Sequence, residues 1–496
     1  MPGHTIFFLL TLSFLSGIVC ASLGLTLLLS IIPAAVVFAA LFATNVDARI
    51  AACASLFLFA GSSFYFLDDH RYQTLVAQVP REGEVPGLIE SDPRKSNDIT
   101  SFYITTAYGR ILVESSLGAP YHYGDIVNAR GSLKAPGDFE TYLAKEHVVA
   151  TMRDPKITIL DSGQGNIAYA FIFRIRDAVR DSFDQLFNPE EAALLSGLTI
   201  GINEDFSPAF LQNLSISGTR HLTAVSGSHM TVVVFVVFGF FAYLFMRRYA
   251  FVLTFIVVTF FVALTGFAAS AIRAGLMAFL VELAKETRRV YAPHNAIAFS
   301  ALVLSLWNPK ILAFDVGFQL SFIAVIGIIY LVPMIQGIFH LNTEPGIFHW
   351  RESLLMTVAA LIGTAPILIV QFQNFSLTAL AANLLVLSAI PLIMVVGFLV
   401  ALCAFVLYPL SFLLSYVLAP LLQYVIFIVN LFGNFALLFN PPLGFIGVVL
   451  YYSALIGAMY WYYREEAEAE KKQMERAKEV PIISAEASEF EIIEIK

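Results

Sequence analysis

Long apolar stretches separated by short polar links make up most of this chain. Stretches of about 17 to 25 residues, long enough to cross a hydrocarbon layer of ~30 Å as a helix, recur about ten to twelve times. Three lie near the N-terminus, at residues 5–29, 31–44 and 50–67, and the others follow residue 222. The pattern predicts a polytopic α-helical membrane protein with about ten to twelve spans, because a helix satisfies its own backbone hydrogen bonds in lipid.

Residues 68–162 interrupt this pattern with a charged, turn-rich segment. Apolar and polar residues alternate there in short stretches bounded by Gly, Pro, Asn and Asp, which is typical of β-strands. The clearest stretches are residues 101–106, 110–115, 125–132 and 156–160. We expect an inserted small β-barrel or sandwich.

Three helices are predicted between this segment and the next apolar stretch. Residues 168–186 combine an apolar stripe with charged faces, which is typical of a helix on the bilayer surface or against the soluble domain. Asn188 and Ser207 each precede a proline and are expected to cap helices. Gly201 and Gly218 are suited to end these two helices.

The patterns divide the chain into five parts. These are N-terminal transmembrane helices (1–67), the β domain (68–162), amphipathic and short capped helices (163–221), a transmembrane core (222–463) and a charged tail (464–496). Basic residues gather in alternate links of the core, at Arg247, Arg248, Lys285, Arg351 and Arg464. Because basic links stay cytoplasmic, the β domain is expected outside and the C-terminus inside, with Lys310 as an exception among the outer links.

Composition agrees with a membrane protein and excludes a chain that is soluble throughout. The 496 residues are 58% hydrophobic and 13% charged, and the mean hydropathy is +0.76. The net charge of −8 is inflated by the acidic tail and does not identify a ligand. Cys20, Cys53 and Cys403 have neither metal-ligand nor disulfide spacing. We therefore expect no metal and no cofactor.

The strongest functional signal lies at residues 218–230, where polar groups meet the start of an apolar span. Arg220, His221, Ser226 and His229 occur there with Gly227, and polar groups at membrane depth are usually kept for function. A broken helix beside a water-filled passage is the favoured interpretation. Hydrogen bonding between helices is the simpler alternative. A Ser-His hydrolase, with Glu204 or Asp205 orienting the histidine, is a further alternative.

A second signal is Arg273, which lies in a run of small residues within an apolar stretch. It is expected either to pair with Asp315 or to offer its guanidinium to a passing phosphate. Asp315 and Gln319 are further candidates for the lining of a pore. Other polar residues of the later spans that fit such a lining are Gln371, Gln373, Asn374 and Asn383.

The β domain carries aromatic and basic residues that suit single-stranded nucleic acid. Bases stack on aromatic rings while basic side chains follow the backbone. The candidates are Tyr103, Tyr108, Arg110, Arg130 and Lys134. Acidic residues of the same segment roughly balance its basic ones, so only a local patch is expected to bind a polyanion.

The order of residues 218–230, Gly-Thr-Arg-His-Leu-Thr-Ala-Val-Ser-Gly-Ser-His-Met, resembles the signature of the ComEC family of competence proteins. Residues 195–201, 269–277 and 315–324 resemble other motifs of that family, and residues 383–391 resemble a fourth more weakly. The resemblance implies an inner-membrane channel that takes up single-stranded DNA during natural transformation. It also implies that the β domain is an extracytoplasmic OB-fold-like barrel.

Many ComEC proteins also carry a metallo-β-lactamase-like domain with a His-x-His-x-Asp-His motif, which this sequence lacks. A channel rather than an enzyme is therefore expected. The implied partners are single-stranded DNA, the lipid bilayer, a DNA receptor, a separate nuclease and a cytoplasmic translocation ATPase. A Ser-His hydrolase and a small-solute transporter remain as alternative functions, and the oligomeric state is left open.

Overall fold

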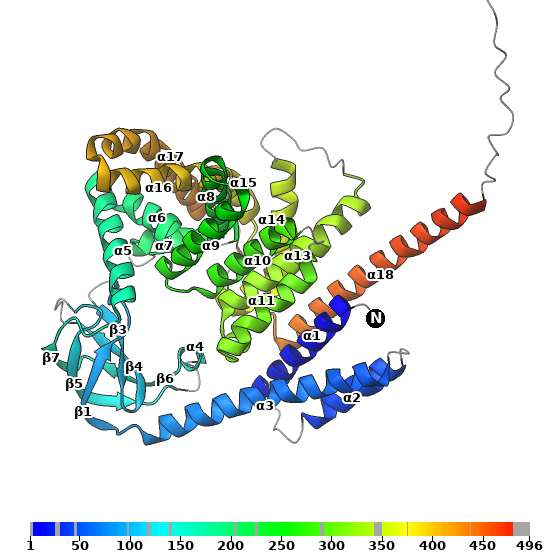
Figure 1. The fold of residues 1–496 in the computed structure, drawn as a ribbon, viewed down its shortest axis with the longest axis horizontal. Helices are drawn as coiled ribbons and strands as arrows, with labels where there is room; N and C mark the ends of the chain where they lie inside the picture. The colour runs from blue at the N-terminus through cyan, green and yellow to red at the C-terminus, as the bar shows by residue number, and fades with distance from the viewer. Residues whose placement is uncertain are drawn as a thin grey trace, which may run out of the picture.

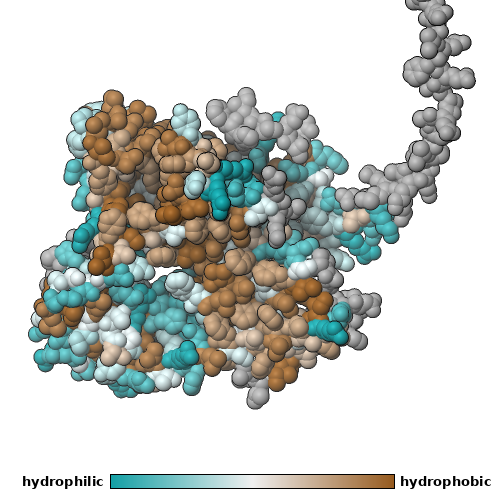
Figure 2. Space-filling view, in the orientation of Figure 1, coloured by the Kyte–Doolittle hydropathy of each residue, from teal (hydrophilic) through white to brown (hydrophobic). Residues whose placement is uncertain are grey.

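The computed structural model describes residues 3–24, 30–43, 47–96, 99–116, 121–137, 141–202, 206–223, 227–287, 292–341, 350–373, 375–436 and 438–479. A small β domain lies at one end of an assembly of helices, and α18 (Phe445–Glu479) extends away from the opposite side (Figure 1). Hydrophilic side chains gather over the β domain and hydrophobic ones over the helices (Figure 2). The protein is a helical membrane protein with a small barrel, as the sequence predicts.

The N-terminal helices are α1 (Gly3–Ser22), α2 (Ile31–Ala43) and α3 (Ala48–Gln78). α1 and α3 pack closely because Gly17 and Gly61 lack side chains, and a Cβ on either would collide with the backbone of the other helix. The predicted boundary at residue 67 is wrong, since α3 continues to Gln78. The helix persists beyond Asp68 and Asp69 because Tyr72 packs into the core of the β domain.

The β domain is a closed five-stranded barrel. Its strands are β1 (Glu82–Ile89), β3 (Ile99–Thr106), β4 (Gly109–Ser115), β5 (Ile126–Lys134) and β6 (Val148–Arg153). They pair in the order β1-β3-β4-β6-β5, and β5 closes the barrel on β1. The β4–β6 pair is parallel and the other pairs are antiparallel. β2 (Arg94–Ser96) and β7 (Lys156–Asp161) extend the sheet at β3 and β5.

Three of the barrel strands and β7 were predicted, whereas β1 and β6 were not. β1 contains Gly83, Pro86 and Gly87, residues that weaken a strand signal. β6 begins with a continuous buried run rather than an alternating one. Packing inside a closed barrel overrides both local signals.

The helices after the barrel confirm the predicted starts and ends. They are α5 (Ile167–Leu186), α6 (Pro189–Ile200) and α7 (Pro208–Ile216). Ser207 caps α7 by accepting a hydrogen bond from the Phe210 amide at 3.2 Å, and Gly201 ends α6 at φ +72°. The predicted side-chain cap at Asn188 is wrong, because its Nδ2 instead donates to Glu191 Oε1 at 3.3 Å.

The transmembrane core follows as helices of unequal length. They are α8 (Gly227–Leu244), α9 (Arg247–Leu264), α10 (Ala269–Glu286), α11 (Pro293–Trp307), α12 (Ile311–Phe314), α13 (Val316–Ile338), α14 (Trp350–Phe372), α15 (Ala379–Leu387), α16 (Ile390–Val406), α17 (Tyr408–Asn434) and α18. A short pairing of β8 (Phe375–Ser376) with β9 (Leu438–Phe439) joins two of the links. α18 continues into the charged tail, as far as Glu479.

The expected count of ten to twelve spans is not confirmed. Within the described residues, seven helices are long and apolar enough to cross a membrane, or eight if α15 and α16, bent by 45°, form one span. The difference arises because several apolar stretches form short helices, such as α2 with 13 residues and α11 with 15 residues. A count of long apolar stretches overestimates the number of straight spans, because some of these stretches form short or bent helices.

Candidate functional site

The polar segment at residues 218–230 is not one continuous helix. Gly218 has φ +71° and packs so closely on Ala379 that a Cβ would collide with it. A single 3-10 turn, η1, covers Arg220–Leu222, and α8 begins only at Gly227. The span expected from residue 222 therefore starts five residues later, because the chain first turns at the end of α7.

The polar candidates of this segment lie in different surroundings. Arg220 is exposed, and its Nη1 donates to Ser215 Oγ at 3.1 Å. His221 is also exposed, whereas His229 on α8 is 0% exposed. Ser226 lies outside the described residues, and so does any Ser-His pair that includes it.

Arg273 lies on α10 and is only 4% exposed. Its Cζ lies 5.6 Å from the centre of the Phe322 ring of α13, and its Nη1 lies 3.7 Å from Met277 Sδ. Its Nη2 lies 3.8 Å from the point that a Cβ at Gly227 would occupy. The structure thus brings Arg273 to the first residue of α8, as part of a contact among α8, α10 and α13.

The predicted alternative of an ion pair between Arg273 and Asp315 is wrong. Asp315 Oδ2 instead pairs with Lys145 Nζ at 2.9 Å, and Lys145 ends the short helix α4 (Thr141–Lys145) of the β domain. Asp315 Oδ1 also caps α13 by accepting from the Phe318 amide at 3.0 Å. Gln319 Nε2 donates to the Ala313 carbonyl of α12 at 2.7 Å. Both side chains thus bind protein groups at the start of α13.

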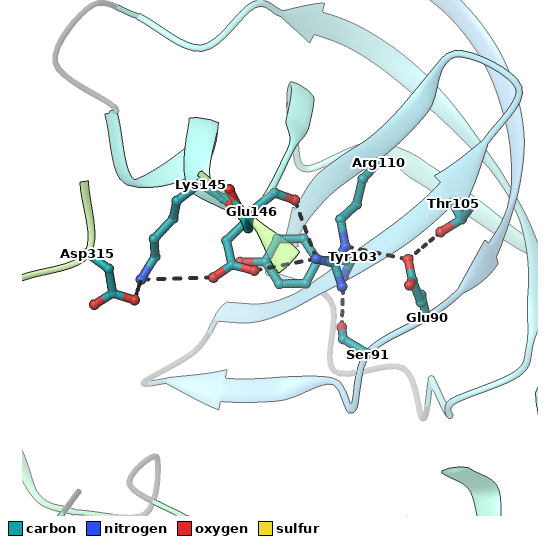
Figure 3. Close-up of polar contacts among 9 residues, drawn as sticks. Glu90, Ser91, Tyr103, Thr105, Arg110, Lys145, Glu146 and Asp315 are labelled. Carbon is teal, nitrogen blue, oxygen red and sulfur yellow. Dashed lines mark hydrogen bonds and ion pairs between the residues drawn. The ribbon is translucent and has the colours of Figure 1, made fainter. Parts of the chain in front are cut away.

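A chain of charged groups links Asp315 to two candidates on the barrel (Figure 3). The Arg110 guanidinium lies 4.5 Å from the centre of the Tyr103 ring. It is flanked by Glu90 at 3.4 Å and by Glu146 Oε2 at 3.4 Å. Glu146 Oε1 lies 4.0 Å from Lys145 Nζ, which completes the link to Asp315. Tyr103, Arg110 and Asp315 therefore belong to one network.

Further contacts between the barrel and the helices surround Lys310. This lysine is only 1% exposed, and its Nζ lies 2.9 Å from Asp69 Oδ1 and 3.7 Å from the centre of the Tyr72 ring. The Tyr72 hydroxyl donates to the Val148 carbonyl of the barrel at 3.0 Å. Asn308 Nδ2 donates to the Lys145 carbonyl at 2.5 Å. We call the contacts of Asp69, Tyr72, Lys145, Asn308, Lys310 and Asp315 the barrel junction.

The barrel junction was not predicted as a unit. Asp315 was singled out because it begins an apolar stretch, but Lys145 is separated from it by 170 positions in the sequence. Lys310 was noticed only as an exception among the links expected outside. A single sequence carries no signal for pairs so far apart.

The other barrel candidates lie outside this network. Arg130 Nη1 pairs with Glu84 Oε1 at 3.2 Å across β5 and β1. Lys134 is exposed at the end of β5, and Tyr108 packs partly against the barrel core. Of these three candidates, Lys134 is exposed and has no carboxylate partner among the described residues, and Tyr108 is half-buried.

Comparison with known proteins identifies the family. A family model described as "Competence protein" matches residues 198–465. ComE operon protein 3 of Bacillus subtilis (strain 168) is 24% identical over 328 residues, which cover 65% of this chain and 41% of that protein. The chain thus spans about two fifths of the length of this relative. No solved structure matches. Because the family match covers more than half of the chain, this protein belongs to the competence protein family, as the resemblance of its motifs to ComEC proteins predicted.

Proposed function

We propose that this protein carries single-stranded DNA across the cytoplasmic membrane into the cell during natural transformation. Membership of the competence family supports a role in natural transformation. A polar turn that leads into α8, beside a buried arginine, supports a route through the helices. The same segment is the one whose motif resembles ComEC proteins.

The barrel junction is the observation that carries this proposal. The Lys145–Asp315 ion pair holds the barrel at the start of α13. The Lys310–Asp69 pair holds the start of α12 against the end of α3, whose Tyr72 packs into the barrel core. Such pairs are kept at a desolvation cost, so they favour a fixed placement over a flexible tether. A strand held by the barrel would then always meet the same end of the helical core.

The barrel itself suits single strands. Five strands closed in this order resemble an OB-fold, whose barrels bind oligonucleotides. Tyr103 and Arg110 offer a stacked ring and guanidinium, and a phosphate would replace Glu90 or Glu146 beside Arg110. The barrel is thus proposed to receive the strand.

The proposed sidedness places the barrel outside and the C-terminus in the cytoplasm. Arg247 Nε pairs with Glu286 Oε2 at 3.2 Å, so the start of α9 and the end of α10 lie at one face. Arg247, Arg248 and Lys285 gather there, as expected of a cytoplasmic face.

The test measures uptake of labelled DNA in a transformable host from which the gene is deleted. Complementation by the wild-type gene should restore uptake. Lys145→Glu and Asp315→Lys should each lower uptake by about tenfold while the protein remains in the membrane. The double exchange should recover most of the loss, because it restores the ion pair.

Reversal of the exposed Arg464–Glu468 pair on α18 is the matched control and should leave uptake unchanged. Full uptake after deletion would exclude the transport function. Full uptake by both single reversals would instead exclude the junction as the element that delivers the strand.

A further inference from the structure

Arg273 is a buried positive charge without a carboxylate. Among the described residues no Asp or Glu lies within ion-pair distance of its guanidinium, and its Nε has no hydrogen-bond partner. Its Nη1 donates to Met277 Sδ, a weak acceptor, at 3.7 Å. An arginine at membrane depth costs several kcal/mol unless it is paired or hydrated. An anion that binds here would remove that penalty.

The N-terminus of α8 adds a second positive group at the same place. The first amides of a helix have no partner within the helix, and the helix dipole makes this end positive. α8 has 18 residues and no acidic residue in its first turn. Gly227 begins it, and Arg273 Nη2 lies 3.8 Å from the point where a Cβ would be. No side chain of residue 227 therefore separates the guanidinium from the start of the helix.

Phe322 and Met277 contact one side of the Arg273 guanidinium. The ring of Phe322, on α13, lies 5.6 Å from Cζ, and Met277 lies beside Nη1. The opposite edge carries Nε, which is buried and has no hydrogen-bond partner among the described residues, and Nη2, which lies toward Gly227. A fork of two N–H groups beside a helix N-terminus matches the oxygens of a phosphate.

We propose that Arg273 and the first turn of α8 form a binding site for a phosphate group. This inference rests on the proposed function in one respect, because it assigns the phosphate to the backbone of the transported strand. A phospholipid headgroup carries the same chemistry. The two sources are separated by experiment.

Full-length protein in phosphatidylcholine nanodiscs is titrated with a fluorescent single-stranded oligonucleotide at several salt concentrations. Loss of one phosphate contact lowers the slope of log K against log [salt] by about 0.7 for a single strand. Arg273→Met should show this change together with about tenfold weaker binding. Arg273→Lys should keep the slope, because it keeps the charge, but bind more weakly because it lacks the fork. Arg464→Met, which removes an exposed arginine of α18, should match the wild type.

Gly227→Ala provides a second test if Arg273→Met does not fold. Among the residues that the structure describes, the nearest atom that the added methyl group would meet is Arg273 Nη2 at 3.8 Å. The methyl group would occupy the space assigned to the phosphate and should weaken oligonucleotide binding without removing a charge.

The lipid source is tested with the same variants in nanodiscs that contain phosphatidylglycerol, with retained lipid counted by native mass spectrometry. If Arg273→Met loses phosphatidylglycerol while the oligonucleotide slope is unchanged, the site binds a headgroup phosphate and its assignment to DNA fails. If folded Arg273→Met and Gly227→Ala match the wild type for both ligands, the phosphate site is excluded. Failure of the proposed function appears separately, as full DNA uptake by the deletion strain.

Discussion

Lys310 and Arg273 are buried in the core and differ in what balances their charge. Lys310 has Asp69 and the Tyr72 ring beside its ammonium group. Arg273 has an aromatic ring and a thioether. A paired buried charge is expected to hold structure, whereas an unbalanced one is suited to bind an anion. Lys310, the basic residue in a link expected outside, is thus explained by its structural role in this ion pair.

The Lys310–Asp69 pair should respond unequally to removal of its partners. Asp69→Asn leaves an ammonium group that is 1% exposed without a counter-charge, and should destabilise the protein by about 3 kcal/mol. Lys310→Met should cost less, because the Asp69 side chain is 35% exposed and stays hydrated. The measurement is the thermal unfolding midpoint in detergent. The double variant should be more stable than Asp69→Asn alone; equal effects of the two single variants would contradict this account.

At the scale of elements, tyrosine hydroxyl groups of α18 donate hydrogen bonds to α14, a helix that contains Pro366. Pro366 of α14 has no N–H to donate to the Ile362 carbonyl. The Tyr451 hydroxyl donates to that carbonyl at 2.8 Å, and the Tyr452 hydroxyl donates to the Gly363 carbonyl at 3.0 Å. The Tyr463 hydroxyl likewise donates to the Tyr330 carbonyl of α13 at 2.8 Å, so tyrosine hydroxyls tie α18 to both α13 and α14.

Tyr451→Phe should therefore destabilise the protein by about 1 kcal/mol, since a carbonyl in an apolar setting loses its donor. In a Pro366→Ala background, the new amide at position 366 can donate to the Ile362 carbonyl. Tyr451→Phe should then have little effect on stability. Tyr460→Phe, at an exposed position of α18, is the control and should have no effect. The thermal unfolding midpoint is measured for both single variants, their combination and the control, and each is compared with the wild type. An equal loss from Tyr451→Phe in both backgrounds would show that the hydroxyl does not compensate for the proline.

The barrel carries an acid-sensitive turn between β6 and β7. The Ser116 amide donates to Asp154 Oδ1 at 2.7 Å. Hydrogen bonds from the Ser116 side chain and from this amide hold the pKa of the Asp154 carboxyl below its ordinary value. The folded pKa is lower than the unfolded one, so the bond stabilises the fold above about pH 4 and is lost as the pH falls through the folded pKa.

Asp154→Asn should lower the unfolding midpoint at pH 7, because a charged acceptor becomes neutral. The difference from the wild type should shrink as the pH falls through the folded pKa of Asp154, because the wild-type carboxyl then becomes neutral as well. Thermal scans across this range check the prediction. A difference that stays constant with pH would mean that the carboxylate charge does not contribute.

For the whole molecule, the barrel and the end of α18 should face opposite sides of the membrane. A helical core with a junction at one face and basic links at the other has a defined direction. In a protein without its native cysteines, Lys134→Cys should react with an impermeant maleimide in intact spheroplasts. Lys472→Cys should react only after permeabilisation. The reverse pattern would invert the proposed direction of transport.

Predictions from sequence succeeded where one local signal decides the structure. α5, α6 and α7 follow from an apolar stripe, from Ser207 as a cap and from glycines with positive φ. Arg273 was found because a charge in an apolar stretch is costly wherever the helix packs. The strands β1 and β6 were not predicted, because their stability comes from neighbouring strands in the closed barrel.

The sequence alone determined that the chain is a helical membrane protein with an inserted β domain, and its motifs indicated the competence family. These properties depend on the hydrophobicity of each stretch and on the order of neighbouring residues, and both can be read directly from the sequence. Only the tertiary structure decided that Asp315 pairs with Lys145 rather than with Arg273. It also decided that Arg273 lies beside Gly227 at the start of α8. Pairing between distant residues depends on which surfaces pack together, and this packing follows from the whole fold.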